Sequence, residues 1–246
     1  MKKLVIMMAI VVAMSGSAMA AIIVDSFDVG PQYVSAGGGG IYGTPYVGAG
    51  VLGGQRDIYC RNASSQIARL DINGGNVSAP GEVLSTAPNG GGALRIIGWG
   101  QSNNGEANWG ANTPLNLNLP DDATIEVDVA EVISNHNDPN GNYPQIRLFF
   151  NGGANRAEYK LGLGTVTAVP QTVVIPDLMA PDWSSAGSVT SADLDDIDGI
   201  RLFWYDSYET RITEVRINDG SAPPIPEPAG LGLIGLALLA VRRRRG

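Results

Sequence analysis

The stretch Thr124-Ile125-Glu126-Val127-Asp128-Val129-Ala130-Glu131 decides the fold class of this 246-residue chain. Its apolar residues Ile125, Val127 and Val129 alternate with polar residues, which is the period of a β-strand that buries one face. An amphipathic helix would instead place apolar residues three and four positions apart. The stretch therefore predicts a strand with its Ile and Val side chains inward and its polar side chains outward.

Segments of the same kind recur along the chain, separated by turns rich in Gly, Asn and Pro. The expected strands cover residues 22–24, 57–61, 65–72, 93–99, 146–150, 157–163, 171–175, 200–205 and 211–217, with a further alternating run at 115–119. In the strand at 65–72 we expect Ile67 and Leu70 to face the core, and Asn73-Gly74-Gly75 to form a hairpin-type turn. No amphipathic helix stands out. The pattern predicts an all-β sandwich, and its long loops favour a jelly roll.

Residues 30–54 are rich in glycine and carry Tyr33, Tyr42 and Tyr46. Because glycine weakens strands and favours turns, we predict a flexible loop here. A binding loop that presents its tyrosines to a ligand is the sharper alternative.

The N-terminus has the pattern of a secretory signal peptide. Lys2 and Lys3 precede an apolar run over residues 4–14, and Ala18-Met19-Ala20 forms a small-x-small cleavage site. We expect a signal peptide at 1–20, cleaved so that the mature chain begins near Ala21. The β-sandwich domain would then occupy residues 21–222, and a separate segment would follow at 223–246.

The last segment has three parts in a fixed order. Pro226-Glu227-Pro228 lies in a proline-rich hinge, an uncharged run covers residues 229–241, and four arginines follow at 242–245. The uncharged run is about 20 Å long as a helix, which is shorter than a usual membrane span. The arginines favour the cytoplasmic side of the membrane, which leaves the preceding chain outside. An ordinary tail anchor is the simpler alternative.

This order of parts resembles the PEP-CTERM sorting signal of Gram-negative bacteria. The resemblance implies a short sorting helix that anchors the protein transiently in the inner membrane and is cut by exosortase, a membrane protease. It also implies delivery to the cell surface or extracellular matrix. By match to the motif, Pro226, Glu227 and Pro228 would be recognised, and Arg242, Arg243, Arg244 and Arg245 would retain the tail.

The charge of the chain excludes some partners. The formal net charge is −8, but the two ends hold two lysines and four arginines, so residues 4–241 keep 10 basic and all 24 acidic residues. The net charge of that part is therefore −14. Nucleic acids and anionic membranes require basic patches, so we expect no nucleic acid as a partner.

We find no catalytic pattern. His136 is the single histidine, and no nucleophile-elbow sequence accompanies it. Cys60 is the single cysteine and lies in an expected strand, where a buried small hydrophobe is the expected role. The sequence also lacks a zinc cluster and a P-loop. We therefore expect no enzyme, although 24 acidic residues leave room for the carboxylate pair of a glycosidase.

Acidic residues cluster at Asp193, Asp195, Asp196 and Asp198. The EF-hand spacing fails because Ile197 stands where an acidic ligand is required. We expect a turn in which Leu194 and Ile197 pack inward and the aspartates are solvated, so we assign no metal ligand and no cofactor. A structural calcium ion is the alternative, either at this turn or at a second set of ligands, namely Asp25, Asp28 and Asp219.

Three functions remain for the domain. The close of the domain, residues 212–219, looks like the last strand of jelly rolls of the carbohydrate-binding-module type, which lies in one sheet with strands near the start. A structural or adhesive role in an exopolysaccharide matrix comes first, because no catalytic pattern is present. A carbohydrate-binding module comes second and requires exposed aromatic residues on one face, with five candidates: Trp99, Trp109, Trp183, Tyr42 and Tyr46. A polysaccharide-degrading enzyme comes third.

Overall fold

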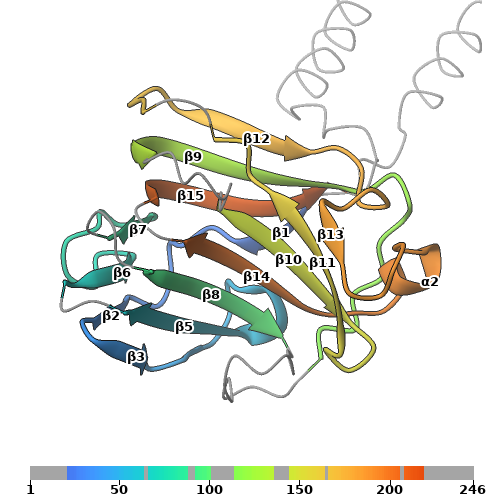
Figure 1. Cartoon of the computed structure of the whole chain (residues 1–246), viewed down its shortest axis with the longest axis horizontal. Coiled ribbons are helices and arrows are strands. Elements are labelled where there is room, and N and C mark those ends of the chain that lie inside the picture. Colours follow the sequence, from blue (N-terminus) through green and yellow to red (C-terminus); the bar gives the residue numbers. More distant parts are fainter. Residues whose placement is uncertain are drawn as a thin grey trace, which may run out of the picture. The chain divides into compact units, whose positions relative to one another are not determined.

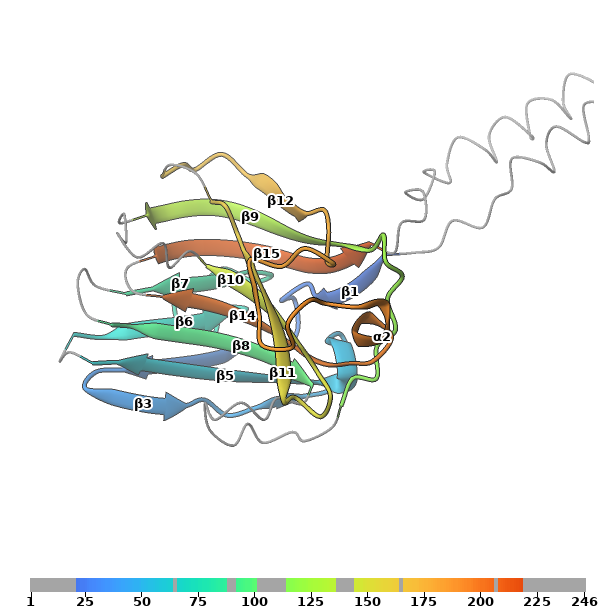
Figure 2. The same ribbon diagram turned by 45° about the vertical axis from the view of Figure 1, so that its right-hand side comes forward.

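Two antiparallel β-sheets pack face to face in the computed structural model of the chain (Figures 1 and 2). The structure describes residues 21–63, 66–87, 92–100, 114–135, 144–163, 166–205 and 208–218. Among these residues the helical elements are the short 3₁₀ helix η1 (Leu52–Gly54) and the single-turn helix α2 (Ser191–Leu194). No helix in this part of the chain is long and apolar enough to cross a membrane. The prediction of an all-β sandwich is confirmed.

Sheet A has the strand order β12-β9-β15-β7-β6-β2, and β1 pairs with β15 beyond the end of β7. Its strands are β1 (Ile22–Asp25), β2 (Gln32–Ala36), β6 (Ala68–Ile72), β7 (Val83–Thr86), β9 (Thr124–Asn135), β12 (Gln171–Ile175) and β15 (Tyr208–Asn218). The first and last strands of the domain are thus neighbours, as expected for residues 212–219.

Sheet B has the strand order β13-β11-β10-β14-β8-β5-β3, and β4 also pairs with β5. Its strands are β3 (Gly39–Tyr42), β4 (Tyr46–Val47), β5 (Gln55–Asn62), β8 (Leu94–Gly100), β10 (Gln145–Phe150), β11 (Asn155–Lys160), β13 (Trp183–Ser184) and β14 (Ile197–Tyr205). The chain passes repeatedly between the two sheets, and this gives the jelly-roll arrangement.

The core lies between the sheets and is filled by alternate residues of each strand. Ile125, Val127 and Val129 of β9 are buried, as predicted, and pack against the inner face of sheet B, which includes Ile97 and Leu202. The expected strands at 22–24, 57–61, 93–99, 146–150, 157–163, 171–175, 200–205 and 211–217 are all present, with ends shifted by a few residues.

The prediction that Ile67 faces the core is wrong, because its side chain is 50% exposed. Strand β6 begins at Ala68, and its buried positions include Ala68 and Leu70. Residues 67 and 70 are three apart, so they cannot lie on the same face of a strand. The turn after β6 does begin at Asn73, whose N–H donates to Glu82 O at 2.9 Å, but it closes a wider loop than a tight hairpin.

The prediction of a flexible loop at residues 30–54 is also wrong, because β2, β3, β4 and η1 form there. Glycine permits a close approach of strands at Gly40, where an added Cβ atom would lie 2.2 Å from the Tyr59 hydroxyl. By contrast, the alternating run at 115–119, which was expected to be strand-like, forms no full strand. Leu117 makes a single β-bridge with Ile197.

Candidate functional site

Two rows of side chains cross the outer face of sheet B, opposite the core. In each row the residues are directly paired from strand to strand, so they lie in line across six strands, or about 24 Å at the usual strand spacing. We call the first the aromatic row, and it runs Tyr42, Tyr59, Ile96, Phe203, Gln145, Lys160. We call the second the charged row, and it runs Asp57, Gly98, Arg201, Arg147, Glu158, Trp183.

Arg147 links the two rows. Its guanidinium carbon lies 4.0 Å from the centre of the Phe203 ring, and its Nε atom lies 3.0 Å from Glu158 Oε1. Arg147 Nη2 also donates to Gln145 Oε1 at 3.2 Å and to the Tyr205 hydroxyl. The cation is therefore held flat against an aromatic ring by a carboxylate, an amide and a phenol. This fixes the relative positions of the aromatic and polar groups on the face.

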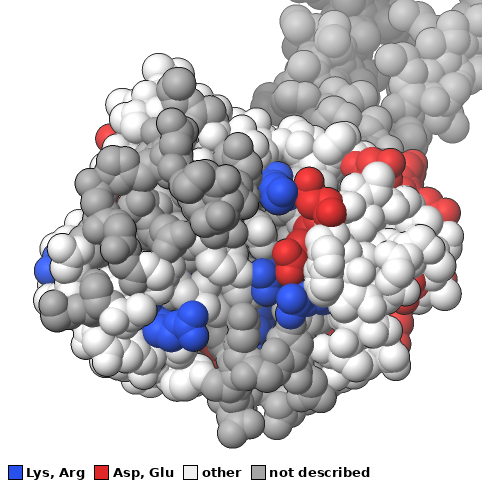
Figure 3. Space-filling view, viewed as in Figure 1, with Lys and Arg blue, Asp and Glu red and all other residues white. Residues whose placement is uncertain are grey.

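Exposed aromatic rings lie toward both edges of the face. Tyr42 is 44% exposed and packs against Tyr59 with ring centres 4.7 Å apart. Trp183 is 46% exposed, and the guanidinium carbon of Arg156 lies 4.7 Å from its ring centre. Figure 3 shows basic and acidic side chains side by side where Figure 1 places β10 and β11. The face thus combines rings that can stack with groups that can hydrogen-bond.

The charged row includes an acid whose ionisation is altered. Burial raises the pKa of Asp57, while a hydrogen bond from Gln55 Nε2 at 2.9 Å and the positive charge of Arg201 oppose the rise. Asp57 is therefore a carboxyl group that accepts a proton more readily than an exposed aspartate.

Of the five aromatic candidates from the sequence, Tyr42 and Trp183 are on this face and exposed. The prediction for Trp99 is wrong: it is buried in the core, because its side chain faces inward from β8 and its Nε1 donates to Asp25 at 3.0 Å. Tyr46 is half-buried, and its hydroxyl donates to Ala49 O at 2.9 Å. Trp109 lies outside the described residues.

Sequence reasoning missed three residues of the face: Tyr59, Tyr205 and Arg147. Each alternates with core residues along its strand, so its outward direction was readable from the period of two. Their proximity to one another could not be predicted, because strand pairing brings together residues that are far apart in the sequence.

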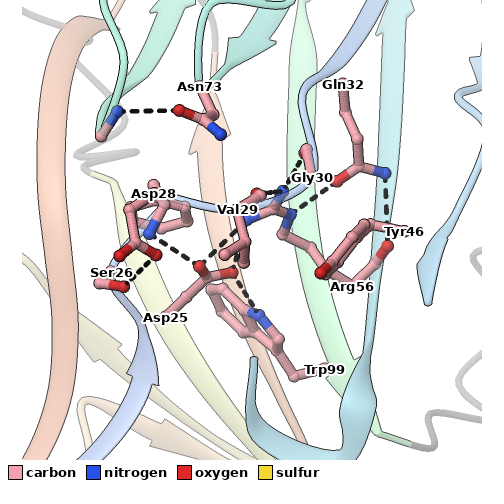
Figure 4. A network of polar contacts seen from close by, with 12 residues as sticks. Asp25, Ser26, Asp28, Val29, Gly30, Gln32, Tyr46, Arg56, Asn73 and Trp99 are labelled. Carbon is pink, nitrogen blue, oxygen red and sulfur yellow. Dashed lines mark hydrogen bonds and ion pairs between the residues drawn. The ribbon is translucent and has the colours of Figure 1, made fainter. Parts of the chain in front are cut away.

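A second cluster, which we call the buried network, lies between the sheets (Figure 4). Arg56 Nη1 lies 2.9 Å from Asp25 Oδ2, and both side chains are 0% exposed. Arg56 Nε donates to Gln32 Oε1 at 2.6 Å, and Phe27 N–H donates to Asp25 Oδ1 at 2.8 Å. Burial raises the pKa of Asp25, and the charge of Arg56 opposes that rise.

The buried network argues against calcium at the set Asp25, Asp28 and Asp219. Both oxygens of Asp25 already accept hydrogen bonds from the protein, and Arg56 supplies the positive charge. Asp28 accepts from Ser26 Oγ at 2.7 Å, and Asp219 lies outside the described residues. Among the described residues, no group of three or more His, Cys, Asp or Glu side chains is placed to hold a metal ion.

The acidic cluster forms a turn around α2, and acidic side chains lie on the corresponding side of the molecule (Figures 1 and 3). Leu194 and Ile197 are buried, as predicted, and Asp193 caps α2 by accepting from Thr190 N–H at 2.9 Å. The prediction that every aspartate is solvated is wrong for Asp198. This residue is buried, because it accepts from the N–H groups of Gly152 and Gly153 at 2.7 and 3.3 Å.

Cys60 is buried, as predicted, and burial raises its pKa to about 11. His136 lies outside the described residues. So do the signal-peptide cleavage residues Ala18 and Ala20 and the sorting residues at 226–228 and 242–245, while Ala21 is the first described residue.

A depression on sheet A is lined by Asp128, Thr172, Thr213 and their neighbours. Burial alone raises the pKa of Asp128, but hydrogen bonds from Arg216 and Thr172 outweigh burial, so the net pKa is lowered. A lowered pKa suits an ion-paired carboxylate and not a proton donor.

No family model matches the chain, and no curated protein sequence matches it. Among solved structures, the chain is similar to a family 11 carbohydrate-binding module from Clostridium thermocellum in complex with a β-1,3-1,4-mixed-linked tetrasaccharide. The identity is 14%, the match covers 82% of this chain and 96% of that chain, and the TM-score is 0.39. A likeness at this level does not carry that module's ligand over to this chain.

Proposed function

We propose that the protein is an exported component of a bacterial cell surface or matrix that binds polysaccharide through the outer face of sheet B. The observation that carries the proposal is the pairing of the aromatic row with the charged row. Tyr42 and Trp183 offer exposed rings, and the exposed Lys160 and half-buried Glu158 offer hydrogen-bonding groups. Gln145 and Arg147 are buried and hold these groups in place.

Sugars suit such a surface for a physical reason. The C–H groups of a pyranose ring form an apolar patch that packs on an aromatic ring, while its hydroxyl groups need hydrogen-bond partners at the same time. A site with aromatic walls and a few fixed polar groups meets both needs. Because the exposed rings Tyr42 and Trp183 lie on strands at opposite edges of sheet B, they favour binding along a chain over capture of a single sugar.

The binding role is compatible with the structural or adhesive role expected from the sequence, because a matrix protein that binds polysaccharide can hold polysaccharide chains together. A degrading enzyme is less well supported. Glycosidases need a carboxylic acid with a raised pKa as proton donor. The depression on sheet A offers Asp128, whose pKa is lowered. Asp57 on sheet B has a raised pKa, but the other acid of its row, Glu158, lies four strand spacings away, or about 19 Å, which is too far for a glycosidase pair.

We also propose export and sorting through the two ends of the chain. The signal peptide would direct export from a Gram-negative-type bacterium, and the tail would hold the protein in the inner membrane until exosortase cuts it. Deletion of Pro226 to Pro228 should trap uncut precursor in the membrane fraction. Release of protein with unchanged mass would contradict this part of the proposal.

The binding proposal is tested by co-sedimentation of the purified full chain with polysaccharide extracted from the host's matrix. We expect saturable binding, and about tenfold weaker binding for the double variant Tyr42→Ala/Trp183→Ala. Tyr33→Ala is the matched control, because Tyr33 is 38% exposed on sheet A. No saturable binding, or an equal loss in the control, would contradict the proposal.

A further inference from the structure

Basic residues concentrate on the outer face of sheet B. Between the two ends of the chain there are 10 basic and 24 acidic residues. Five of the 10 basic residues face outward on this one sheet: Arg61, Arg147, Arg156, Lys160 and Arg201. The acidic residues facing outward on the same strands are Asp57 and Glu158, and Asp182 directly before β13 adds a third carboxylate, which accepts from Lys160 N–H at 2.6 Å. With five basic and three acidic residues, this face carries a net charge of +2 within a strongly acidic domain.

Part of this charge is already paired. Glu158 Oε1 lies 3.0 Å from Arg147 Nε and 3.1 Å from Arg156 Nε, so one carboxylate is shared by two arginines. Asp57 is attracted by Arg201 across the charged row. The three acids therefore do not balance the five cations. Arg147 and Arg201 are buried, so the cations that a bound partner can reach are Arg61, Arg156 and Lys160.

The most accessible cations flank the aromatic row. Lys160 is exposed and ends that row on β11. Arg61 is exposed and follows Tyr59 by two positions on β5, so it lies on the same face at the other side of the sheet. Four strand spacings separate β11 from β5, or about 19 Å. Cations this far apart match charges repeated along a polymer better than a single anionic group.

From this arrangement we infer that the polysaccharide bound by sheet B is anionic, with carboxylate or other acid groups repeated along the chain. The inference rests on the proposed binding function and names its substrate class. The protein's overall negative charge repels a polyanion. The local positive charge on sheet B therefore directs a polyanion to this face of the domain and away from the others.

The experiment compares the purified full chain with two soluble polymers, polygalacturonate as the polyanion and an uncharged β-glucan, at low and high salt. Calorimetric titration should show tighter binding to polygalacturonate, weakened by salt because salt screens exposed charges. The double variant Arg61→Ser/Lys160→Ser should bind polygalacturonate at least tenfold more weakly, since hydrogen bonds to charged groups are the strong ones. Arg69→Ser is the control, because Arg69 is an exposed arginine on sheet A.

The outcomes separate the inference from the proposed function. Salt-independent binding of the uncharged glucan, with polygalacturonate no better, overturns the anionic class and leaves polysaccharide binding standing. If the protein binds neither soluble polymer and does not bind the host's own polysaccharide, both the anionic class and the proposed binding function are overturned. An equal loss in Arg69→Ser would show attraction to any positive residue and would also overturn the inference. Because all three residues are exposed, thermal unfolding of the variants should match the wild type within about 0.5 kcal/mol.

Discussion

The buried network and the outer face of sheet B are built from the same kinds of side chain. Arg56 has a carboxylate, an amide and aromatic rings as neighbours: Asp25, Gln32, Phe27 and Tyr46. Arg147 has the same set: Glu158, Gln145, Phe203 and Tyr205. The difference lies in where the groups point. Arg56 reaches across the sandwich, while Arg147 lies along the surface of one sheet.

This difference separates structure from binding. Arg56 and Asp25 join β5 of sheet B to β1 of sheet A, and both are sealed from solvent. Every contact there is made within the protein. On the outer face, the middle of both rows is buried, including Phe203, Arg147 and Arg201. The groups within reach of a ligand lie toward the ends of the rows, where Tyr42, Trp183 and Lys160 are exposed.

The largest expected effect comes from breaking the buried pair. Arg56→Met leaves the Asp25 carboxylate buried without its positive partner, which should lower the free energy of unfolding by about 3–5 kcal/mol. The double variant Asp25→Leu/Arg56→Met removes both charges and should recover much of that loss. Urea unfolding followed by fluorescence measures both.

Arg147→Met is the matched change on the outer face. The Arg147 side chain is 6% exposed and makes hydrogen bonds to Gln145 and Tyr205, so the substitution should cost about 2 kcal/mol, less than Arg56→Met. Glu158 keeps Arg156 as a second positive partner at 3.1 Å, so no carboxylate is left alone. Equal costs for Arg56→Met and Arg147→Met would show that the two clusters do not differ as described.

An effect smaller than that of Arg56→Met is expected for Trp99→Phe. The substitution keeps an aromatic ring in the core but removes the N–H that donates to Asp25 at 3.0 Å. The lost hydrogen bond to a charged group should cost about 1.5–3 kcal/mol of stability. Polysaccharide binding should be unchanged, because Trp99 faces the core. A binding defect in a folded Trp99→Phe protein would contradict the separation of the two regions.

The smallest effect is a pH dependence from Asp57. Its pKa in the folded protein is raised above the usual 3.8, so the folded state holds the proton more tightly than the unfolded state. Stability is therefore lost as pH rises from about 3.8 through the raised pKa, and the loss is about 1.4 kcal/mol for each pH unit between the unfolded and folded pKa. Asp57→Asn should remove this loss, which urea unfolding at a series of pH values will show. A difference between the two proteins that stays constant with pH would contradict the assignment.

The sequence was sufficient for the strands whose alternation is strong. In β9, the period of two identified both the strand and its buried side, because Ile125, Val127 and Val129 occupy consecutive inward positions. It failed at residues 30–54, where glycines lower the local strand signal and pairing with β5 and β6 supplies the stability.

The candidate site was less predictable than the fold. Composition identified Tyr42 and Trp183 as candidate ligand-binding residues, but it identified Trp99 equally. The sequence around a single aromatic residue does not say whether its side chain faces the core or the outer face of a sheet. The aromatic and charged rows depend on the register of paired strands such as β8 and β14, which lie about 100 residues apart in the sequence, and local sequence does not encode that register.

The central claim, that polysaccharide binds on the outer face of sheet B, is tested most directly by hydrogen–deuterium exchange of the full chain with and without saturating host polysaccharide. We predict slower amide exchange on binding in β5, β8, β10 and β14, with no change in β9, β12 and β15 of sheet A. Protection confined to the sheet A strands, or no protection at saturation, would contradict the claim.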